Sequence, residues 1–302
     1  MDDQPAFNQP REGIAGARAA GRRWPAYLVV GLLAIFGLRA PQPAATPPPV
    51  DFSGQPVTVH QLPLGVSNAY LLESETALVL VDAGLAGQAD AILAAIDASD
   101  KPLTLIYVTH AHIDHYGSAA EMRRRTGAPI AVHAADANAL AAGGTRLGSL
   151  RLLQGASRGL LALAEPLLHV EPAPPDVLVA GGDSLAAYGI DATVLHTPGH
   201  TPGSTTLLVN DGQVAVAGDL LANSGGAHVQ RSYADDWAVL AASIERLKAV
   251  APELTFTGHG GGAITAAELQ ALALDPVDPL SAEGLNNLLS GMTRLWSPRS
   301  SE

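Results

Sequence analysis

Four candidate metal ligands stand within six residues, at His110, His112, Asp114 and His115. Imidazole nitrogens and carboxylate oxygens together are donors that zinc and other divalent transition metals bind. The four residues follow an apolar run over residues 103–108, which is typical of a buried strand. Residues two apart lie on the same side of extended backbone, so His110 and His112 are expected to converge on one metal ion. Asp114 and His115 come where the chain turns into a helix, and we expect them to face a second ion.

Three more candidate ligands occur at the ends of predicted strands, far from this cluster in the sequence. His200 lies in the turn TPGHTPGS, whose glycines and prolines form a rigid corner between two predicted strands. Asp219 follows the predicted strand 213–217, and His259 follows the predicted strand 254–257. A single histidine or aspartate at a strand end is common, but their shared placement indicates that they belong to one site with the first four.

Together these motifs resemble the metallo-β-lactamase superfamily, and within it the glyoxalase II-like and lactonase-like hydrolases. The resemblance covers about residues 57–270. It rests on the HxHxDH motif, the TPGHTPGS turn, the Gly-Asp pair after a strand and the Gly-His-Gly near the end. It implies an α/β fold, a four-layer αββα sandwich, with the site at one edge of the two sheets.

The resemblance also implies how the ligands are shared between two divalent metal ions. The first ion would be held by His110, His112 and His200. The second would be held by Asp114, His115 and His259. Asp219 would bridge both ions, and Asp82, in the sequence VDAG, would orient ligands from behind. Zinc is the metal that these donors suit best, and iron and manganese are the alternatives.

Two cations lower the pKa of a water molecule between them to roughly 7, and so hold a hydroxide that can attack a carbonyl. We therefore expect a binuclear metal-dependent hydrolase of an ester, thioester, lactone or amide. Asp114 is the predicted catalytic residue, because it can pass a proton to the leaving group. Asp219 in the bridging position argues against a true β-lactamase. Candidate substrate contacts lie in the polar loop after it, at His228, Arg231 and Tyr233.

Two other functions are compatible with the motifs. A mononuclear iron dioxygenase acting on sulfur compounds would use similar ligands, and one iron per chain would distinguish it from a hydrolase with two zinc ions. A flavin-partnered diiron protein is disfavoured, because His112 stands where a glutamate is expected. A non-catalytic, membrane-tethered metal-binding module is the remaining alternative, and the intact set of seven ligands argues against it.

Alternating strands and helices must position these ligands, and they predict one layered α/β domain over residues 57–274. Strand-like runs occur at 57–62, 69–72, 77–81, 103–108, 129–132, 192–195, 204–209, 213–217 and 254–257. Helical spacing of apolar residues occurs at 85–96 and at 237–250, and further helices are expected at 118–125 and from 134 onward. The strands come in blocks with helices between them, so two sheets with helices outside are expected. The leucine-rich insertion 143–175 is predicted to cap the core as a helix or to cover the cleft as a lid for hydrophobic substrates.

The chain outside this domain predicts membrane attachment. The expected segments are a disordered polar N-terminus at 1–23, a transmembrane anchor or signal h-region at 24–40, a Pro-rich linker at 41–56 and a C-terminal tail at 275–302. We therefore expect a membrane-anchored or exported protein whose catalytic domain lies on the extracytoplasmic side.

The composition limits the partners. The 302 residues include 29 Asp and Glu against 17 Lys and Arg, for a formal net charge of −12. Nucleic-acid binding needs a basic face to neutralise phosphates, so no nucleic-acid partner is expected and a small-molecule substrate is. The chain has no cysteine, which excludes disulfides and thiolate metal ligands. The oligomeric state is left open.

Overall fold

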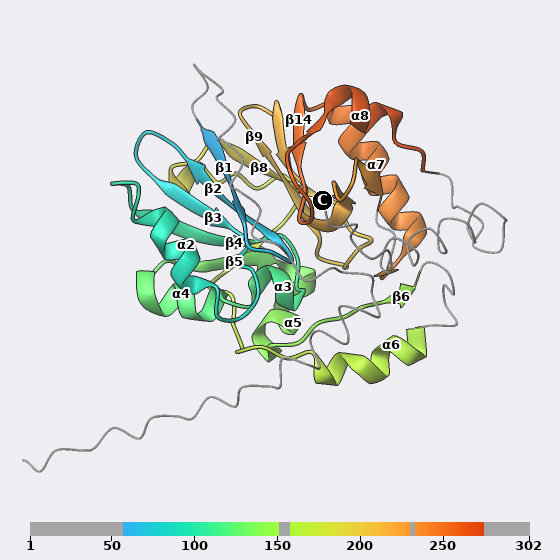
Figure 1. Cartoon of the computed structure of the whole chain (residues 1–302), viewed down its shortest axis with the longest axis horizontal. Coiled ribbons are helices and arrows are strands. Elements are labelled where there is room, and N and C mark those ends of the chain that lie inside the picture. Colours follow the sequence, from blue (N-terminus) through green and yellow to red (C-terminus); the bar gives the residue numbers. More distant parts are fainter. Residues whose placement is uncertain (1–56, 151–157, 230–232, 275–302) are drawn as a thin grey trace, which may run out of the picture.

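The computed structural model describes residues 57–150, 158–229 and 233–274, which form two β-sheets packed face to face with helices on their outer sides (Figure 1). This arrangement confirms the predicted αββα sandwich. The predicted limits of the domain, residues 57 and 274, stay a prediction. Four predicted segments lie outside the described residues: 1–23, 24–40, 41–56 and 275–302. Within the described part of the chain, no helix has the length and apolar character needed to cross a membrane.

The first sheet has the strand order β1-β2-β3-β4-β5-β7. Its strands are β1 (Thr58–Pro63), β2 (Asn68–Glu73), β3 (Leu78–Val81), β4 (Leu103–Val108), β5 (Ile130–His133) and β7 (Val177–Val179). The strands β1, β2 and β3 pair antiparallel, whereas β3, β4, β5 and β7 run parallel. The helices α2 (Ala89–Ile96) and α4 (Ala119–Thr126) connect the parallel strands and pack on the outer face of this sheet.

The second sheet has the order β15-β14-β10-β9-β8. Its strands are β8 (Ala192–His196), β9 (Thr205–Val209), β10 (Val214–Val216), β14 (Leu254–Phe256) and β15 (Ile264–Thr265). The helices α7 (Trp237–Val250) and α8 (Ala266–Ala271) cover its outer face. The connections contain α3 (Ile113–Tyr116), α5 (Ala137–Ala142), β6 (Ser149–Leu150), α6 (Arg158–Ala164), β11 (Leu221–Ala222), β12 (His228–Val229) and β13 (Tyr233–Ala234). They also contain the 3₁₀ turns Ala134–Asp136, Glu165–Leu167, Ala186–Tyr188 and Gly218–Leu220.

The strand β4 shows why the sequence forms layers. Its side chains alternate between two apolar surroundings: Leu105 and Tyr107 face the second sheet, while Ile106 and Val108 face the helices. A strand covered on both sides is apolar at every position, which explains the continuous apolar run before His110.

The ends of several strands bring the candidate ligands to one edge of the sandwich. Because β3 and β4 are parallel neighbours, Asp82 and His110 emerge side by side after them. In the second sheet, β10 and β14 are parallel neighbours, so Asp219 and His259 also emerge side by side. The two edges are joined where Thr205 N donates a hydrogen bond to the carbonyl that precedes His110, at 3.0 Å. Ligand sites of α/β proteins are commonly found at such carboxyl ends of strands.

A buried asparagine joins the two sheets, and we expect its replacement to destabilise the domain. Asn210, after β9, accepts a hydrogen bond from Val57 N at 3.1 Å and donates one to Val57 O at 2.8 Å. Its φ of 52° is tolerated better by asparagine than by alanine. Asn210→Ala should lower the free energy of unfolding by about 2–4 kcal/mol, since it leaves two buried backbone groups unpaired. Denaturant unfolding measures this loss, and Asn210→Gly separates the hydrogen bonds from the φ. Wild-type stability in both variants would contradict the role.

Candidate metal centre

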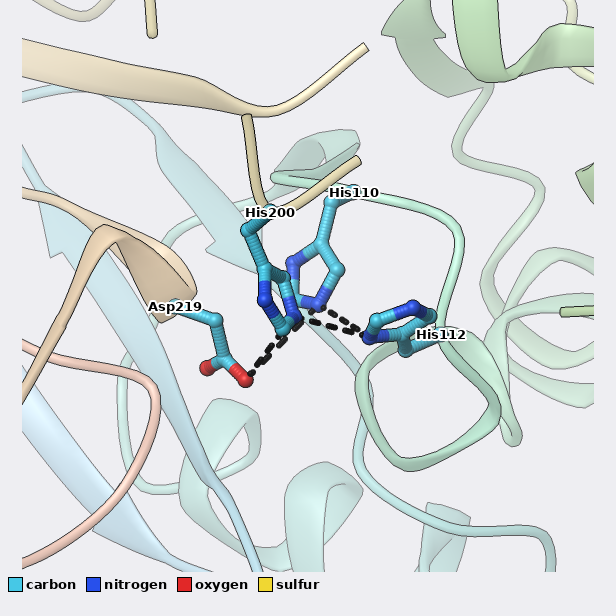
Figure 2. Close-up of side chains that lie close together, drawn as sticks. All are labelled: His110, His112, His200 and Asp219. Atoms are coloured by element: carbon cyan, nitrogen blue, oxygen red, sulfur yellow. Dashed lines mark hydrogen bonds and ion pairs between the residues drawn. The ribbon is translucent and has the colours of Figure 1, made fainter. Parts of the chain in front are cut away.

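Three histidines and an aspartate point toward one another at the edge of the two sheets (Figure 2). His112 Nδ1 lies 3.1 Å from His110 Nε2 and 2.9 Å from His200 Nε2. Asp219 Oδ2 lies 3.3 Å from His200 Nε2 and 3.9 Å from His110 Nε2. All four residues are buried. We call this group the first cluster.

A second cluster lies beside the first and contains Asp114, His115 and His259. His259 Nε2 lies 3.5 Å from both His115 Nε2 and Asp114 Oδ2. Asp219 contacts this cluster as well, because its Oδ1 lies 3.3 Å from His115 Nε2 and its Oδ2 lies 3.1 Å from His259 Nε2. The structure thus brings together all seven candidate ligands predicted from the sequence, with Asp219 between the two clusters.

Hydrogen bonds behind the rings determine which nitrogen of each histidine carries its proton. His112 Nε2 donates to Arg146 O at 2.7 Å, and His259 Nδ1 donates to Val66 O at 2.7 Å. A carbonyl oxygen only accepts, so the ring nitrogen that faces it carries the hydrogen. In a neutral imidazole the opposite nitrogen then has a free lone pair, and in both residues that nitrogen faces the clusters.

Asp82 sets the rings of His110 and His115 in the same way. Asp82 Oδ2 accepts from His115 Nδ1 at 2.8 Å and from Thr109 Oγ1 at 2.9 Å, while Asp82 Oδ1 accepts from Thr109 N at 2.8 Å. The Thr109 hydroxyl, having given its hydrogen to Asp82, accepts from His110 Nδ1 at 3.0 Å. One buried carboxylate therefore directs the Nε2 lone pairs of His110 and His115, one in each cluster.

This arrangement fits a pair of metal cations. Lone pairs and carboxylate oxygens that face one another at 2.9–3.6 Å repel unless a positive charge lies between them. Ligand nitrogens around one tetrahedral zinc ion, each about 2.05 Å from it, are separated by roughly 3.3 Å. The nitrogen separations of the first cluster are close to that value. Imidazole and carboxylate donors suit zinc, iron and manganese.

The two clusters differ in their charge environment. Burial, with the neighbouring imidazoles, lowers the pKa of His110 well below its ordinary value, and burial lowers the pKa of His112 to about 3. Burial also opposes protonation of His115 and His259, but the nearby carboxylates, Asp219 first and then Asp114, together outweigh it, so the pKa of His115 is raised well above its ordinary value and that of His259 to about 9. Burial would raise the pKa of Asp219, but His259 and His115 hold it well below its usual range. The second cluster is thus the more negative one, and a cation bound there would replace protons.

The structure describes two of the three candidate substrate contacts, Tyr233 and His228. The ring of Tyr233, in β13, lies 5.5 Å from that of His112 and 5.6 Å from that of His200, between centroids. His228 lies in β12 and donates from Nδ1 to Val229 O at 2.8 Å. Arg231 lies outside the described residues.

Sequence reasoning missed the turn between β1 and β2, which supports the second cluster. Besides Val66 O, this turn supplies Ser67 Oγ, which donates to Asp114 O. The Asn68 side chain donates to Thr257 O at 3.0 Å and to Gly260 O at 2.8 Å, on either side of His259. The adjacent Ser-Asn pair between two predicted strands was the available sign, but it resembles an ordinary turn.

The residue directly before His259 is Gly258, and a larger residue would not fit there. A Cβ atom at this position would overlap Asp219 Oδ1 and His115 Cε1, so only a glycine lets the strand end approach the two ligands.

The insertion is not a single capping helix. Its start contacts the metal centre, because Arg146 O accepts from His112, and its β6 pairs with β13 at Tyr233 and Ala234. Further on, α6 has Leu161 buried, while Leu163 is 76% exposed.

Comparison with known sequences identifies the family. Residues 62–259 match the metallo-beta-lactamase superfamily. A protein of Bacillus subtilis (strain 168) named "Probable metallo-hydrolase YqgX" is 30% identical over 204 residues, which cover 66% of this chain and 89% of the relative. Another protein of that strain, "Probable metallo-hydrolase YflN", is 28% identical over 232 residues, covering 67% and 83%. The chain belongs to the metallo-β-lactamase superfamily, a group of metal-binding hydrolase-fold proteins, as the resemblance implied.

Solved structures agree with this fold. The chain is similar to BLEG-1, described as a B3 metallo-beta-lactamase, with a TM-score of 0.53, 28% identity and coverage of 70% of this chain and 95% of that one. It is also similar to TTHA1623 in a di-iron-bound form, with a TM-score of 0.51, 28% identity and coverage of 70% and 96%. Because one neighbour is named as a β-lactamase and the other holds iron, membership of the family leaves the metal and the substrate open.

We predict that Asp82→Asn weakens metal binding, chiefly at the second cluster. Asp82 accepts three hydrogen bonds, and an amide would place a donor against at least one of those donors. Loss of such a supporting carboxylate typically costs about 10–100-fold in metal affinity. Elemental analysis after dialysis against a chelator should find fewer metal ions per chain than in wild type. Asp90→Asn, at an exposed aspartate, is the matched control, and equal retention in both variants would refute the role.

Proposed function

We propose that the protein is a hydrolase that uses two divalent metal ions, with zinc the preferred metal, to cleave an ester, thioester, lactone or amide. The observation that carries this proposal is Asp219, whose carboxylate faces ligands of both clusters at 3.1–3.3 Å. A carboxylate in this position suits a bridge between two cations. When bound, two such ions supply the acidity that makes water a nucleophile at neutral pH and the positive charge that stabilises a leaving group.

In this proposal the clusters divide the ligands as the family resemblance implied. One ion is held by His110, His112 and His200. The other is held by Asp114, His115 and His259. Asp219 bridges them, and Asp82 orients rings in both sets.

Asp114 is the proposed proton carrier. Its side chain is 15% exposed, against 2% for that of Asp219, so it is the carboxylate of the centre that a substrate can approach. Ser67 Oγ donates to its main-chain oxygen and so holds the start of α3 in place. A carboxylate at the mouth of the centre can hold a proton and pass it to the leaving group.

Tyr233, whose ring lies beside those of His112 and His200, is a proposed substrate contact. Burial, followed by the charges of Asp114 and Asp219, raises its pKa well above the ordinary value, so the hydroxyl keeps its proton and can donate a hydrogen bond. His228 and Arg231 are the other proposed contacts. We also propose that the insertion, which pairs with β13 beside Tyr233, favours substrates with an apolar acyl group.

A substrate panel on protein of known metal content tests the proposed function. The panel contains chromogenic esters with short and long acyl chains, lactones, thioesters, phosphodiesters and a cephalosporin. We expect two metal ions per chain and turnover of at least one carbonyl substrate, with long acyl chains preferred. One iron per chain together with oxidation of a sulfur compound would favour the alternative dioxygenase. Fully loaded protein that turns over nothing on the panel would contradict the proposal.

Asp114→Ala should abolish turnover and release one of the two metal ions. The variant removes both a ligand oxygen of the second cluster and the proposed proton carrier, and loss of general acid catalysis alone costs about 10²–10⁴-fold in rate. Initial rates and elemental analysis of the same preparation measure the two effects. Asp100→Ala, at an exposed position, is the control. Unchanged activity would rule out this role for Asp114.

A further inference from the structure

Asp136 is a buried aspartate that belongs to neither cluster. It lies after β5, at the end of the 3₁₀ turn Ala134–Asp136 and directly before α5. Aspartate in this position usually accepts hydrogen bonds from the first turn of its own helix. Here the side chain makes no such bond, although it is only 3% exposed. Its carboxylate therefore has another use within the fold.

The carboxylate accepts three hydrogen bonds, all from the two segments that carry the histidines of the first cluster. Asp136 Oδ2 accepts from Ala111 N at 2.8 Å, and Ala111 lies between His110 and His112. The same oxygen accepts from Thr201 Oγ1 at 2.7 Å, and Oδ1 accepts from Gly203 N at 2.8 Å. Thr201 and Gly203 belong to the turn that presents His200. One side chain thus joins segments that lie about 90 residues apart.

The ring of His200 needs this support more than the other rings do. Among the residues that the structure describes, His200 Nδ1 is buried without a hydrogen-bond partner. The rings of His110 and His112 are each held from behind, by Thr109 and by Arg146 O. The position of the His200 ring therefore depends on the backbone of its own turn, which Asp136 holds.

A side chain with two accepting oxygens satisfies all three donors. Three donors face two oxygens, and an asparagine would turn an N–H₂ group toward one of them. The carboxylate also approaches the turn of His200 closely, because a Cβ atom at Gly203 would overlap it.

We propose that Asp136 is a positioning residue of the metal centre, whose carboxylate fastens the loop of His110 and His112 to the turn of His200. Without it, the 2.9 Å separation between His112 Nδ1 and His200 Nε2, which spans the two segments, would lose this support. The inference rests on the two-ion centre of the proposed function. Asp136 would support the ligands of the first ion, whereas Asp82 chiefly supports those of the second.

Zinc affinity of the first cluster tests this proposal. The His259→Ala substitution impairs the second cluster. In that background, competition between the protein and a chelator for zinc, with no other metal present, reports on binding by His110, His112 and His200. In this background we expect Asp136→Asn to weaken zinc binding by about 10–100-fold. Thr201→Val, which removes one of the three donors with little change of shape, should give a smaller loss. Asp136→Asn and Thr201→Val together should lose less than the product of the two, because both act on one hydrogen-bond network.

Asp176→Asn is the matched control, since Asp176 Oδ2 accepts from Ile130 N at the opposite end of β5. Thermal unfolding of the metal-free variants separates folding from metal binding. Asp136→Asn that unfolds earlier but binds zinc as tightly as its parent would overturn the proposal. So would wild-type affinity in Thr201→Val, or equal loss in Asp136→Asn and Asp176→Asn. Because the affinity is measured without substrate, the result decides the role of Asp136 independently of whether the protein proves to be a hydrolase.

Discussion

The candidate metal centre depends on which nitrogen of each histidine ring carries the proton. Hydrogen bonds behind the rings of His110, His112, His115 and His259 put the ring proton on the outer nitrogen, so the inner nitrogens offer lone pairs to a shared space. Those lone pairs repel one another and repel the carboxylates of Asp114 and Asp219 unless positive charge lies among them. Protons supply part of that charge in the second cluster, as the raised pKa of His259 indicates, and bound metal cations would replace them.

The αββα sandwich keeps these polar groups outside its apolar layers. The apolar residues lie in three layers of contact, one between the sheets and one under each pair of outer helices, while the polar groups gather at one edge. Each sheet contributes part of the centre from the ends of parallel strands, so neither sheet forms it alone. Asp219 from the second sheet reaches ligands that come from the first, and hydrogen bonds across the edge keep the two in register.

Much of this could be read from the sequence. The predicted strand 103–108 coincides with β4, because a long apolar run is a reliable indicator, and the predicted helix 118–125 is displaced by one residue from α4. The seven ligands also come together as their motifs predicted. The supports could not be predicted: main-chain oxygens such as Val66 O leave no mark in a sequence, and Asp136 stands in an alanine-rich stretch with no motif. The pairing of β6 with β13 involves two residues on each side, too few for any periodicity.

The use of main-chain oxygens behind His112 and His259 has a consequence for how such a centre changes over time. The carbonyl oxygens of Arg146 and Val66 accept the hydrogen bonds from these rings. A substitution of either side chain therefore leaves the acceptor of the ring in place. A deletion or insertion of one residue in either loop would move the carbonyl itself. The side chains of these two loops can therefore change, provided that the loops keep their length, while the rings of His112 and His259 keep their orientation.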